Sequence, residues 1–428
     1  RRPMNDMMDQ AASTARTPST VPGLRIGPGL WAGPKRRYTL HDPRTGWYFR
    51  VGEHEHFLIQ RLDGVRTLED VEIEFAEAFE RRLTSAHWEA LFSLLAKRAL
   101  LVGSDTPALV ARLRDAHDVQ VAESRTIMHA RFPLVHADRF VAALAPLARR
   151  LHNRTLWTLT WMATAVLSAY VLLDFHSLMR TARGVWDRPA TAITLVVVLW
   201  LSVAAHEVAH GLVAWLSGAR DIRIGVLWRF PAFVPYCQVD DIVLFHNRWD
   251  RISVVLAGPT VSVAICFPFV ILHIVTQGEG TIGVLATAMT VFGLFSGLVN
   301  LVPLFRMDGY LALSHAFDVE DLEGSSHAFL GALVRGRRQG TSSGPRDGLY
   351  FTYGVLSLIA LTALVIAICS VALRFLTSVL PLPVALAVVI FGVLVTFAVG
   401  IIASKRARSR LADLPGTQST FTSKWGDS

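Results

Sequence analysis

The chain carries Leu201-Ser-Val-Ala-Ala-His206-Glu207-Val-Ala-His210-Gly211-Leu-Val-Ala-Trp215 within an apolar run that is long enough to cross a bilayer. On a helix His206 and His210 would leave the same face about one turn apart. This spacing suits two nitrogen ligands of one Zn²⁺, with Glu207 beside the metal to move protons. A purely structural histidine pair is the alternative. Polar groups at this depth cost on the order of a few kcal/mol unless they are paired or ligated, which favours the metal site.

Composition excludes a disordered chain and argues against an ordinary soluble domain, because 52% of the 428 residues are hydrophobic and 18% are charged. The formal net charge of +8 is compatible with nucleic-acid binding, but in a membrane protein such an excess usually lies in cytoplasmic loops. The cysteines at positions 237, 266 and 369 form no CxxC pattern and predict neither a disulfide framework nor a zinc knot. We therefore expect a protein of the lipid bilayer.

Apolar runs of spanning length predict a mainly α-helical, polytopic membrane domain over residues 155–404. We expect about six transmembrane helices, at Leu156–Leu173, Thr191–Leu216, Ile252–Thr276, Thr281–Phe305, Leu349–Leu373 and Val379–Ser404. Arginines gather before the first run, between the second and third, between the fourth and fifth, and in the basic tail of residues 405–428. The positive-inside rule then predicts a multi-pass protein of the cell membrane with both termini in the cytoplasm.

The front of the chain predicts a small α+β domain between a tail and a linker. Residues 1–36 are polar and rich in Thr, Pro and Gly without an apolar h-region, so we expect a disordered tail rather than a signal peptide. Residues 104–154 predict a linker with an amphipathic helix on the membrane surface. Residues 37–103 predict two strands joined by the turn Asp42-Pro-Arg-Thr-Gly46, helices beginning near Glu53, Thr67 and Ser85, and a strand over Ala99–Val102.

A hairpin, three helices and a strand make a winged-helix-like arrangement. It resembles the PqqD-like domains that hold the leader segment of ribosomally made peptides. A winged helix can also bind DNA, but the third helix begins Ser85-Ala-His-Trp-Glu-Ala-Leu-Phe and is not strongly basic, so no nucleic acid is expected as a partner. A purely structural cytosolic cap is a further interpretation.

The loop between the second and third spans has strand-like patterning. Residues 222–229 alternate in polarity, Pro231 interrupts the pattern, and residues 232–239 are again typical of extended chain. We expect a β-hairpin at the membrane face beside the His-Glu-x-x-His helix. An exposed edge near Ile222–Arg229 could accept an extended substrate as an added strand, and a closed interfacial loop is the equal alternative.

Two histidines leave a catalytic zinc site one protein ligand short. The fourth span ends in Asn300-Leu-Val-Pro303-Leu-Phe-Arg306-Met307-Asp308-Gly309, where Asn300 and Pro303 break helical regularity. Broken helix at this depth is tolerated where it lines a polar cavity. The second and fourth spans run in the same direction, so Asp308 can reach the depth of His210. Asp308 is therefore the candidate third ligand, although a lone aspartate here would more often be a helix-end charge.

These motifs resemble those of the site-2 protease family of intramembrane zinc metalloproteases. The resemblance rests on His206-Glu207-x-x-His210, on Ala257-Gly258-Pro259 and on Asn300-x-x-Pro303-x-x-x-x-Asp308-Gly309, and covers about residues 193–313. It implies zinc bound by His206, His210 and Asp308, Glu207 as general base, and Asn300 near the substrate or the oxyanion. Arg306-Met307 departs from the Pro-Leu that the family commonly has, which leaves the local loop shape open.

The front domain followed by the spans looks like the bacterial peptide zinc metalloproteases, some of which accompany peptide-modification systems such as daptide biosynthesis. The resemblance implies a zinc metalloendopeptidase that removes the leader of a ribosomally synthesised peptide held by the N-terminal domain. A regulatory protease that releases a membrane-tethered factor is the second hypothesis. The third is a non-catalytic metal-binding or peptide-export component, against which the intact Glu207 argues, because ligation alone does not need it.

Overall fold

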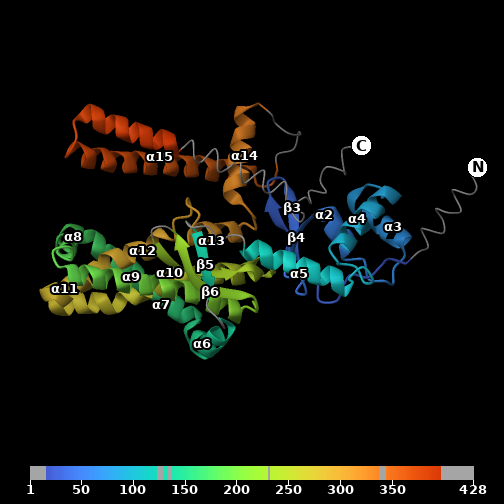
Figure 1. The fold of residues 1–428 in the computed structure, drawn as a ribbon, viewed down its shortest axis with the longest axis horizontal. Coiled ribbons are helices and arrows are strands. Elements are labelled where there is room, and N and C mark those ends of the chain that lie inside the picture. Colours follow the sequence, from blue (N-terminus) through green and yellow to red (C-terminus); the bar gives the residue numbers. More distant parts are fainter. Residues whose placement is uncertain (1–15, 123–128, 134–136, 230–231, 337–343, 397–428) are drawn as a thin grey trace, which may run out of the picture.

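The computed structural model describes residues 16–122, 129–133, 137–229, 232–336 and 344–396. Figure 1 shows a blue α/β part near the N-terminus at one end and a green-to-yellow bundle of long helices at the other. Helix α5 (Pro107–Ala122) lies between them. The fold is mainly helical, as the apolar runs of spanning length predicted.

The N-terminal hairpin forms as the turn residues predicted. Strands β3 (Lys35–His41) and β4 (Tyr48–Gly52) are antiparallel, with Leu40 opposite Phe49. Gly46 ends the turn at φ +75°, a left-handed conformation that favours glycine, and its N–H donates to the Asp42 carbonyl at 2.9 Å. The predicted turn is therefore confirmed.

Three helices cover this hairpin: α2 (Glu53–Ile59), α3 (Leu68–Phe79) and α4 (Ser85–Lys97). The α3 helix begins with a capping box, because the Thr67 side chain accepts from the Asp70 N–H and the Asp70 side chain accepts from the Thr67 N–H. Apolar side chains from the three helices and both strands form one buried cluster, which includes Leu40, Leu58, Val71, Phe75 and Leu91.

The predicted tail needs correction, because part of it is folded. Strands β1 (Arg25–Ile26) and β2 (Leu30–Ala32) pair with one edge of β3, while β4 takes the other edge. Residues 16–36 therefore belong to the N-terminal domain, and residues 1–15 lie outside the described chain. The Pro and Gly content concealed these short strands, and apolar side chains of the segment, such as Val21 and Leu30, are buried.

The strand predicted at Ala99–Val102 is reduced to a single bridge between Leu101 and Thr20. The residues on either side of this bridge are also hydrogen-bonded: the Val21 N–H donates to Leu100 O and the Val102 N–H donates to Ser19 O, both at 3.0 Å. The piece expected to be a tail thus supplies the partner of this final extended segment. The winged-helix assignment stays a prediction.

Five helical segments are long and apolar enough to cross a membrane, so the chain has the build of a membrane protein. They are α7 (Arg154–Leu173), α9 (Pro189–Leu216), α10 (Arg248–Thr276), the run Gly280–Val299 and α15 (Asp347–Thr377). A sixth span is not established: the helix Leu382–Thr396 is shorter, and residues 397–404 lie outside the described chain.

The fourth span ends earlier than predicted and is not uniformly α-helical. It consists of α11 (Gly280–Ala288), the π-helical turn η2 (Met289–Gly293) and α12 (Leu294–Val299). Residues 300–307 then form turns before α13 (Asp308–Ala316). The break predicted at Asn300 is confirmed, whereas the predicted end at Phe305 is wrong.

Helix α10 is the centre of the bundle. It packs against α9, α13, α7 and all three parts of the fourth span, whereas α15 packs mainly on α14 (Leu322–Val334). Small residues allow the close approach of neighbouring helices: a side chain at Gly297 would meet Val263, and one at Gly293 would lie 3.0 Å from Cys266 Sγ. Tight packing of this kind holds α10 in a defined position beside α9.

The predicted hairpin is present, but it belongs to a three-stranded sheet. Strands β6 (Ile222–Arg229) and β7 (Ala232–Val239) are antiparallel, and β5 (His129–Pro133), from the predicted linker, pairs with the other edge of β6. The expectation of an exposed edge along β6 is therefore wrong, because β5 occupies that edge. The two strands lie so close that a side chain at Gly225 would begin 2.3 Å from the Phe132 carbonyl oxygen. The predicted amphipathic helix is present as α6 (Ala137–Leu151), which packs against α9 and β6, and its place on the membrane surface stays a prediction.

Asp241 joins the N-terminal domain to this sheet. It lies in the 3-10 helix η1 (Asp240–Leu244) directly after β7 and is 1% exposed. Its carboxylate accepts hydrogen bonds from Arg25 Nη1, Tyr48 OH and the Arg220 N–H, each at 3.0 Å. Burial alone would raise the pKa of the Asp241 carboxyl, but the bonds from Arg220 and Arg25 bring it below the usual value. A charged Asp241 therefore joins three segments.

A second junction lies after α13, near β2. The Trp31 N–H donates to Asp318 O at 2.8 Å and the Glu320 N–H donates to Trp31 O at 2.9 Å, so β2 pairs with this segment. The same Asp318 forms an ion pair with Arg251 of α10, whose guanidinium is buried and also donates to Phe245 O at 2.5 Å. The N-terminal domain is thus attached to the segments that follow β7 and α13.

Candidate metal centre

The two motif histidines lie together on α9. Their ring centroids are 4.7 Å apart, with the planes nearly perpendicular at 82°, and the Nε2 atoms of His206 and His210 are 3.1 Å apart. Both rings therefore direct the same nitrogen toward one point, as the spacing of four residues predicted. His206 is 5% exposed, which places this point inside the protein.

Asp308 completes the group from the first residue of α13. Its Oδ2 atom lies 3.0 Å from His206 Nε2, and its Oδ1 atom lies 3.6 Å from His210 Nε2. Ligand atoms of the three side chains all lie within 4.8 Å of one another, so the group could hold a metal ion. The start of a helix also favours a carboxylate, because its unpaired N–H groups carry partial positive charge. The structure thus brings the three predicted ligands together.

The other ring nitrogens are held by α10. His210 Nδ1 lies 2.8 Å from the Val254 carbonyl oxygen, and His206 Nδ1 lies 2.9 Å from Ser262 Oγ. A carbonyl oxygen can only accept, so His210 carries its proton on Nδ1 and presents the Nε2 lone pair to the group; the serine allows the same tautomer for His206. This arrangement of second partners is typical of metal-ligating histidines.

Gly258 gives the rings their space. It lies between Val254 and Ser262 at intervals of four residues, so all three share one face of α10. A side chain at Gly258 would begin 2.4 Å from His210 Nε2 and 2.5 Å from His206 Nε2. The backbone of α10 therefore forms a wall of the metal group, which explains the glycine in Ala257-Gly258-Pro259.

The donor set fits a zinc ion. Two imidazole nitrogens and one carboxylate are the three protein ligands that a catalytic zinc site commonly has, and the Nδ1 contacts already select the tautomer that binds metal. The same set also accepts other divalent transition metals, which geometry alone does not separate.

Glu207 points toward the sheet. Its Oε2 atom accepts a hydrogen bond from the Cys237 N–H of β7 at 2.7 Å. Helix α9 packs closely on the sheet here, because a side chain at Gly211 would meet Cys237, Ile222 and Ile224 at 3.1–3.3 Å. The backbone of β7 thus fixes one carboxylate oxygen, and within the described chain Oε1 has no hydrogen-bond partner.

Asn300 supports the centre through its backbone. Its carbonyl oxygen accepts the Gly309 N–H at 2.7 Å, directly after Asp308. A side chain at Gly309 would overlap Leu301 O at 2.1 Å, so the turn needs this glycine. Among the described contacts, the Asn300 side chain makes no hydrogen bond to the three ligands. Its predicted role toward substrate stays a prediction.

Sequence reasoning missed three partners of the centre: the Ser262 hydroxyl, the Val254 carbonyl and the Cys237 amide. Only Ser262 has a signal in the sequence, since it follows Gly258 of the Ala257-Gly258-Pro259 motif by four residues and would share its helix face. No family model, curated protein or solved structure matches the chain. The assignment of a function therefore depends on the geometry and the residue patterns.

Proposed function

We propose that the chain is an intramembrane zinc metalloendopeptidase that hydrolyses a peptide bond in a membrane-associated substrate. The observation that carries this proposal is the convergence of His206, His210 and Asp308, with Glu207 adjacent on the same helix. In this proposal His206, His210 and Asp308 hold Zn²⁺. When bound, the ion supplies Lewis acidity that polarises a carbonyl and makes water a better nucleophile.

Glu207 moves the proton in this reaction. As general base it takes a proton from the attacking water at Oε1 while the Cys237 N–H holds Oε2. The water oxygen bonds to the scissile carbonyl carbon, the C–N bond breaks, and the proton passes from Glu207 to the leaving amine. Asn300 would bind the substrate backbone or the oxyanion from the turn that carries Asp308.

The extended substrate would lie along β7 rather than β6. The Phe233 carbonyl accepts from Trp200 Nε1 at 2.7 Å and the Cys237 N–H donates to Glu207, so these β7 groups face α9. Because α9 already occupies these two groups, a substrate strand could pair only with the remaining outward-facing groups of β7, which would bring its carbonyls beside Glu207. With both termini in the cytoplasm, this sheet and the metal centre lie near the cytoplasmic face of the cell membrane.

Metal removal tests the centre directly. We expect the purified full-length chain to contain about one zinc per molecule, and His206→Ala to lose most of it, because two protein ligands hold the ion weakly. His327→Ala is the matched control. His327 lies on α14, its Nε2 atom is 3.0 Å from Ser357 Oγ of α15, and it is not one of the three ligands. The measurement is elemental analysis after dialysis. Equal zinc content in His206→Ala and wild type would refute the site.

Binding of a leader peptide by the N-terminal domain distinguishes the two protease hypotheses, maturation of a peptide and release of a membrane-tethered factor. In the described chain β4 pairs with β3 alone, which leaves an edge for an extended leader. In a pulldown we expect the full-length chain to retain a precursor-peptide leader and not a scrambled leader, which is the control. We also expect it to cleave that precursor. Cleavage of a transmembrane factor without leader binding would favour the regulatory protease. Intact zinc without any cleavage would favour the non-catalytic component.

A further inference from the structure

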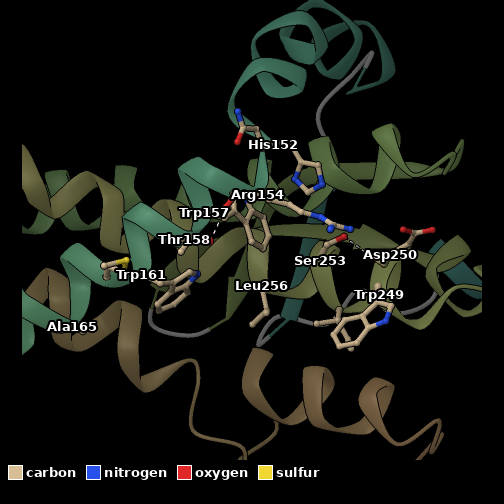
Figure 2. A pocket seen from close by; sticks show the side chains of 13 residues that line it. His152, Arg154, Trp157, Thr158, Trp161, Ala165, Trp249, Asp250, Ser253 and Leu256 are labelled. Atoms are coloured by element: carbon tan, nitrogen blue, oxygen red, sulfur yellow. Dashed lines mark hydrogen bonds between the residues drawn. The ribbon is translucent and has the colours of Figure 1, made fainter.

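The start of α7 and the start of α10 enclose a groove that lies apart from the metal centre. Its volume is about 980 Å³, and Figure 2 shows the side chains that line it. The lining comes from the first three turns of α7, from the first turns of α10 and from the link before α7. We propose that this groove binds an anionic phospholipid, with the phosphate at Arg154 and an acyl chain along Trp157 and Trp161.

The lower part of the groove, between Trp157 and Trp161 of α7 and Leu256 of α10, has the chemistry of an acyl-chain site. Trp157 and Trp161 lie one turn apart on α7, and Leu256 faces them from α10 (Figure 2). Met162 is 62% exposed and Trp249 is 63% exposed, so described protein does not cover these apolar surfaces. Both helices are candidate spans, and bilayer lipid is therefore the neighbour of this surface.

The mouth of the groove has the chemistry of a phosphate site. Figure 2 shows Arg154 extending from α7 toward Ser253 and Asp250 of α10. Within the described chain no carboxylate lies in ion-pair distance of its guanidinium. Asp250 is the one acid in the lining, and it accepts a hydrogen bond from Asn247 Nδ2 at 3.2 Å. Arg154 therefore offers unpaired donors for an anion.

Neighbouring groups make the mouth basic overall. Arg248 lies over the Trp249 ring at 5.6 Å and adds a second guanidinium. The first turn of α7 adds partial positive charge, although Asn153 Oδ1 already accepts the N–H groups of Thr155 and Leu156. Burial lowers the pKa of His152 below its usual value, which favours the uncharged ring. Arg154 in the lining and Arg248 beside Trp249 thus outnumber the one lining acid, Asp250, which matches an anionic headgroup.

The groove and the metal centre lie on different faces of α10. Val254, Gly258 and Ser262 face the histidines, whereas Trp249, Ile252 and Leu256 line the groove. A lipid in the groove would support the helix that forms the wall of the metal group without entering it. This inference is independent of whether the chain is a protease.

Native mass spectrometry of the full-length chain in detergent tests the proposal. The lipids are phosphatidylglycerol and phosphatidylcholine with identical acyl chains, and glycerol 3-phosphate serves as the soluble phosphate ester. We expect phosphatidylglycerol to bind preferentially and Arg154→Gln to weaken it roughly tenfold, because one charge-assisted contact is lost. Arg180→Gln on α8 (Phe175–Arg183) should bind like wild type, since Arg180 is not in the lining.

A second variant tests the acyl-chain part without changing charge. Ala165 is exposed and lines the lower groove, so Ala165→Phe should fill it and weaken binding of phosphatidylglycerol. Far-UV circular dichroism and the melting temperature confirm that each variant is folded. Equal binding of the two lipids, or wild-type binding by both Arg154→Gln and Ala165→Phe, would overturn the proposal. Competition by glycerol 3-phosphate at concentrations equal to the lipid would exclude the acyl chain and overturn it as well.

Discussion

Glu207→Gln is expected to keep its zinc and to lose cleavage by about 10²–10⁴-fold, the range of a positioned general base. The amide is isosteric with the carboxylate and its oxygen can still accept the Cys237 N–H, which lies 2.7 Å from Oε2. It has no carboxylate to take the proton of the attacking water. The geometry of His206, His210 and Asp308 does not use Glu207, so metal content should not change. Single-turnover cleavage and elemental analysis of the same preparation measure both effects.

Glu279→Gln is the matched control for this substitution. Glu279 precedes α11, the helix at the far end of the fourth span from Asn300 and Asp308, so the same loss of a carboxylate should leave cleavage unchanged. Cleavage by Glu207→Gln at the wild-type rate would show that another group is the base. Loss of zinc together with activity would instead mean that Glu207 supports the ligands.

The metal group was predictable from sequence because its two parts are local patterns. The i, i+4 spacing of His206 and His210 determines a common helix face before any tertiary contact is known. Asp308 followed from a helix break at Asn300 and from the shared direction of two spans. The partners of these groups were not predictable in the same way. Val254 and Cys237 contribute backbone groups, a carbonyl and an amide. Nearly every residue has such groups, so only the packing of the folded chain determines which of them contact the centre.

The N-terminal domain shows the complementary limit. Helices α2, α3 and α4 and the β3–β4 hairpin follow from caps, periodicity and the Asp42–Gly46 turn. Strands β1 and β2 are two and three residues long, and they exist because the edge of β3 is free to pair with them. Strand β5 likewise depends on β6, a segment far along the chain. Strands this short show no periodicity in the sequence. Their residues were therefore assigned from composition, which predicted a tail and a linker.

Gly258→Ala is the substitution that we expect to damage the centre most for its size. The added carbon would begin 2.4 Å from His210 Nε2 and 2.5 Å from His206 Nε2, far inside van der Waals contact. Helix α10 is half buried in the bundle and cannot retreat freely, so the rings must turn away from Asp308. We expect zinc affinity to fall at least 10–100-fold, as for loss of groups that orient metal ligands, and stability to fall by about 1–3 kcal/mol from overpacking.

Gly348→Ala separates this effect from helix propensity. Gly348 lies in the first turn of α15, and a side chain there would meet no atom within 4 Å, so alanine should be neutral or slightly stabilising. Competition with a chromogenic zinc chelator gives the affinity of each variant, and thermal unfolding gives the stability. Wild-type zinc affinity in Gly258→Ala would mean that the rings do not lie against α10. In that case the Nδ1 contacts to Val254 and Ser262, and with them the assigned tautomers, would be wrong too.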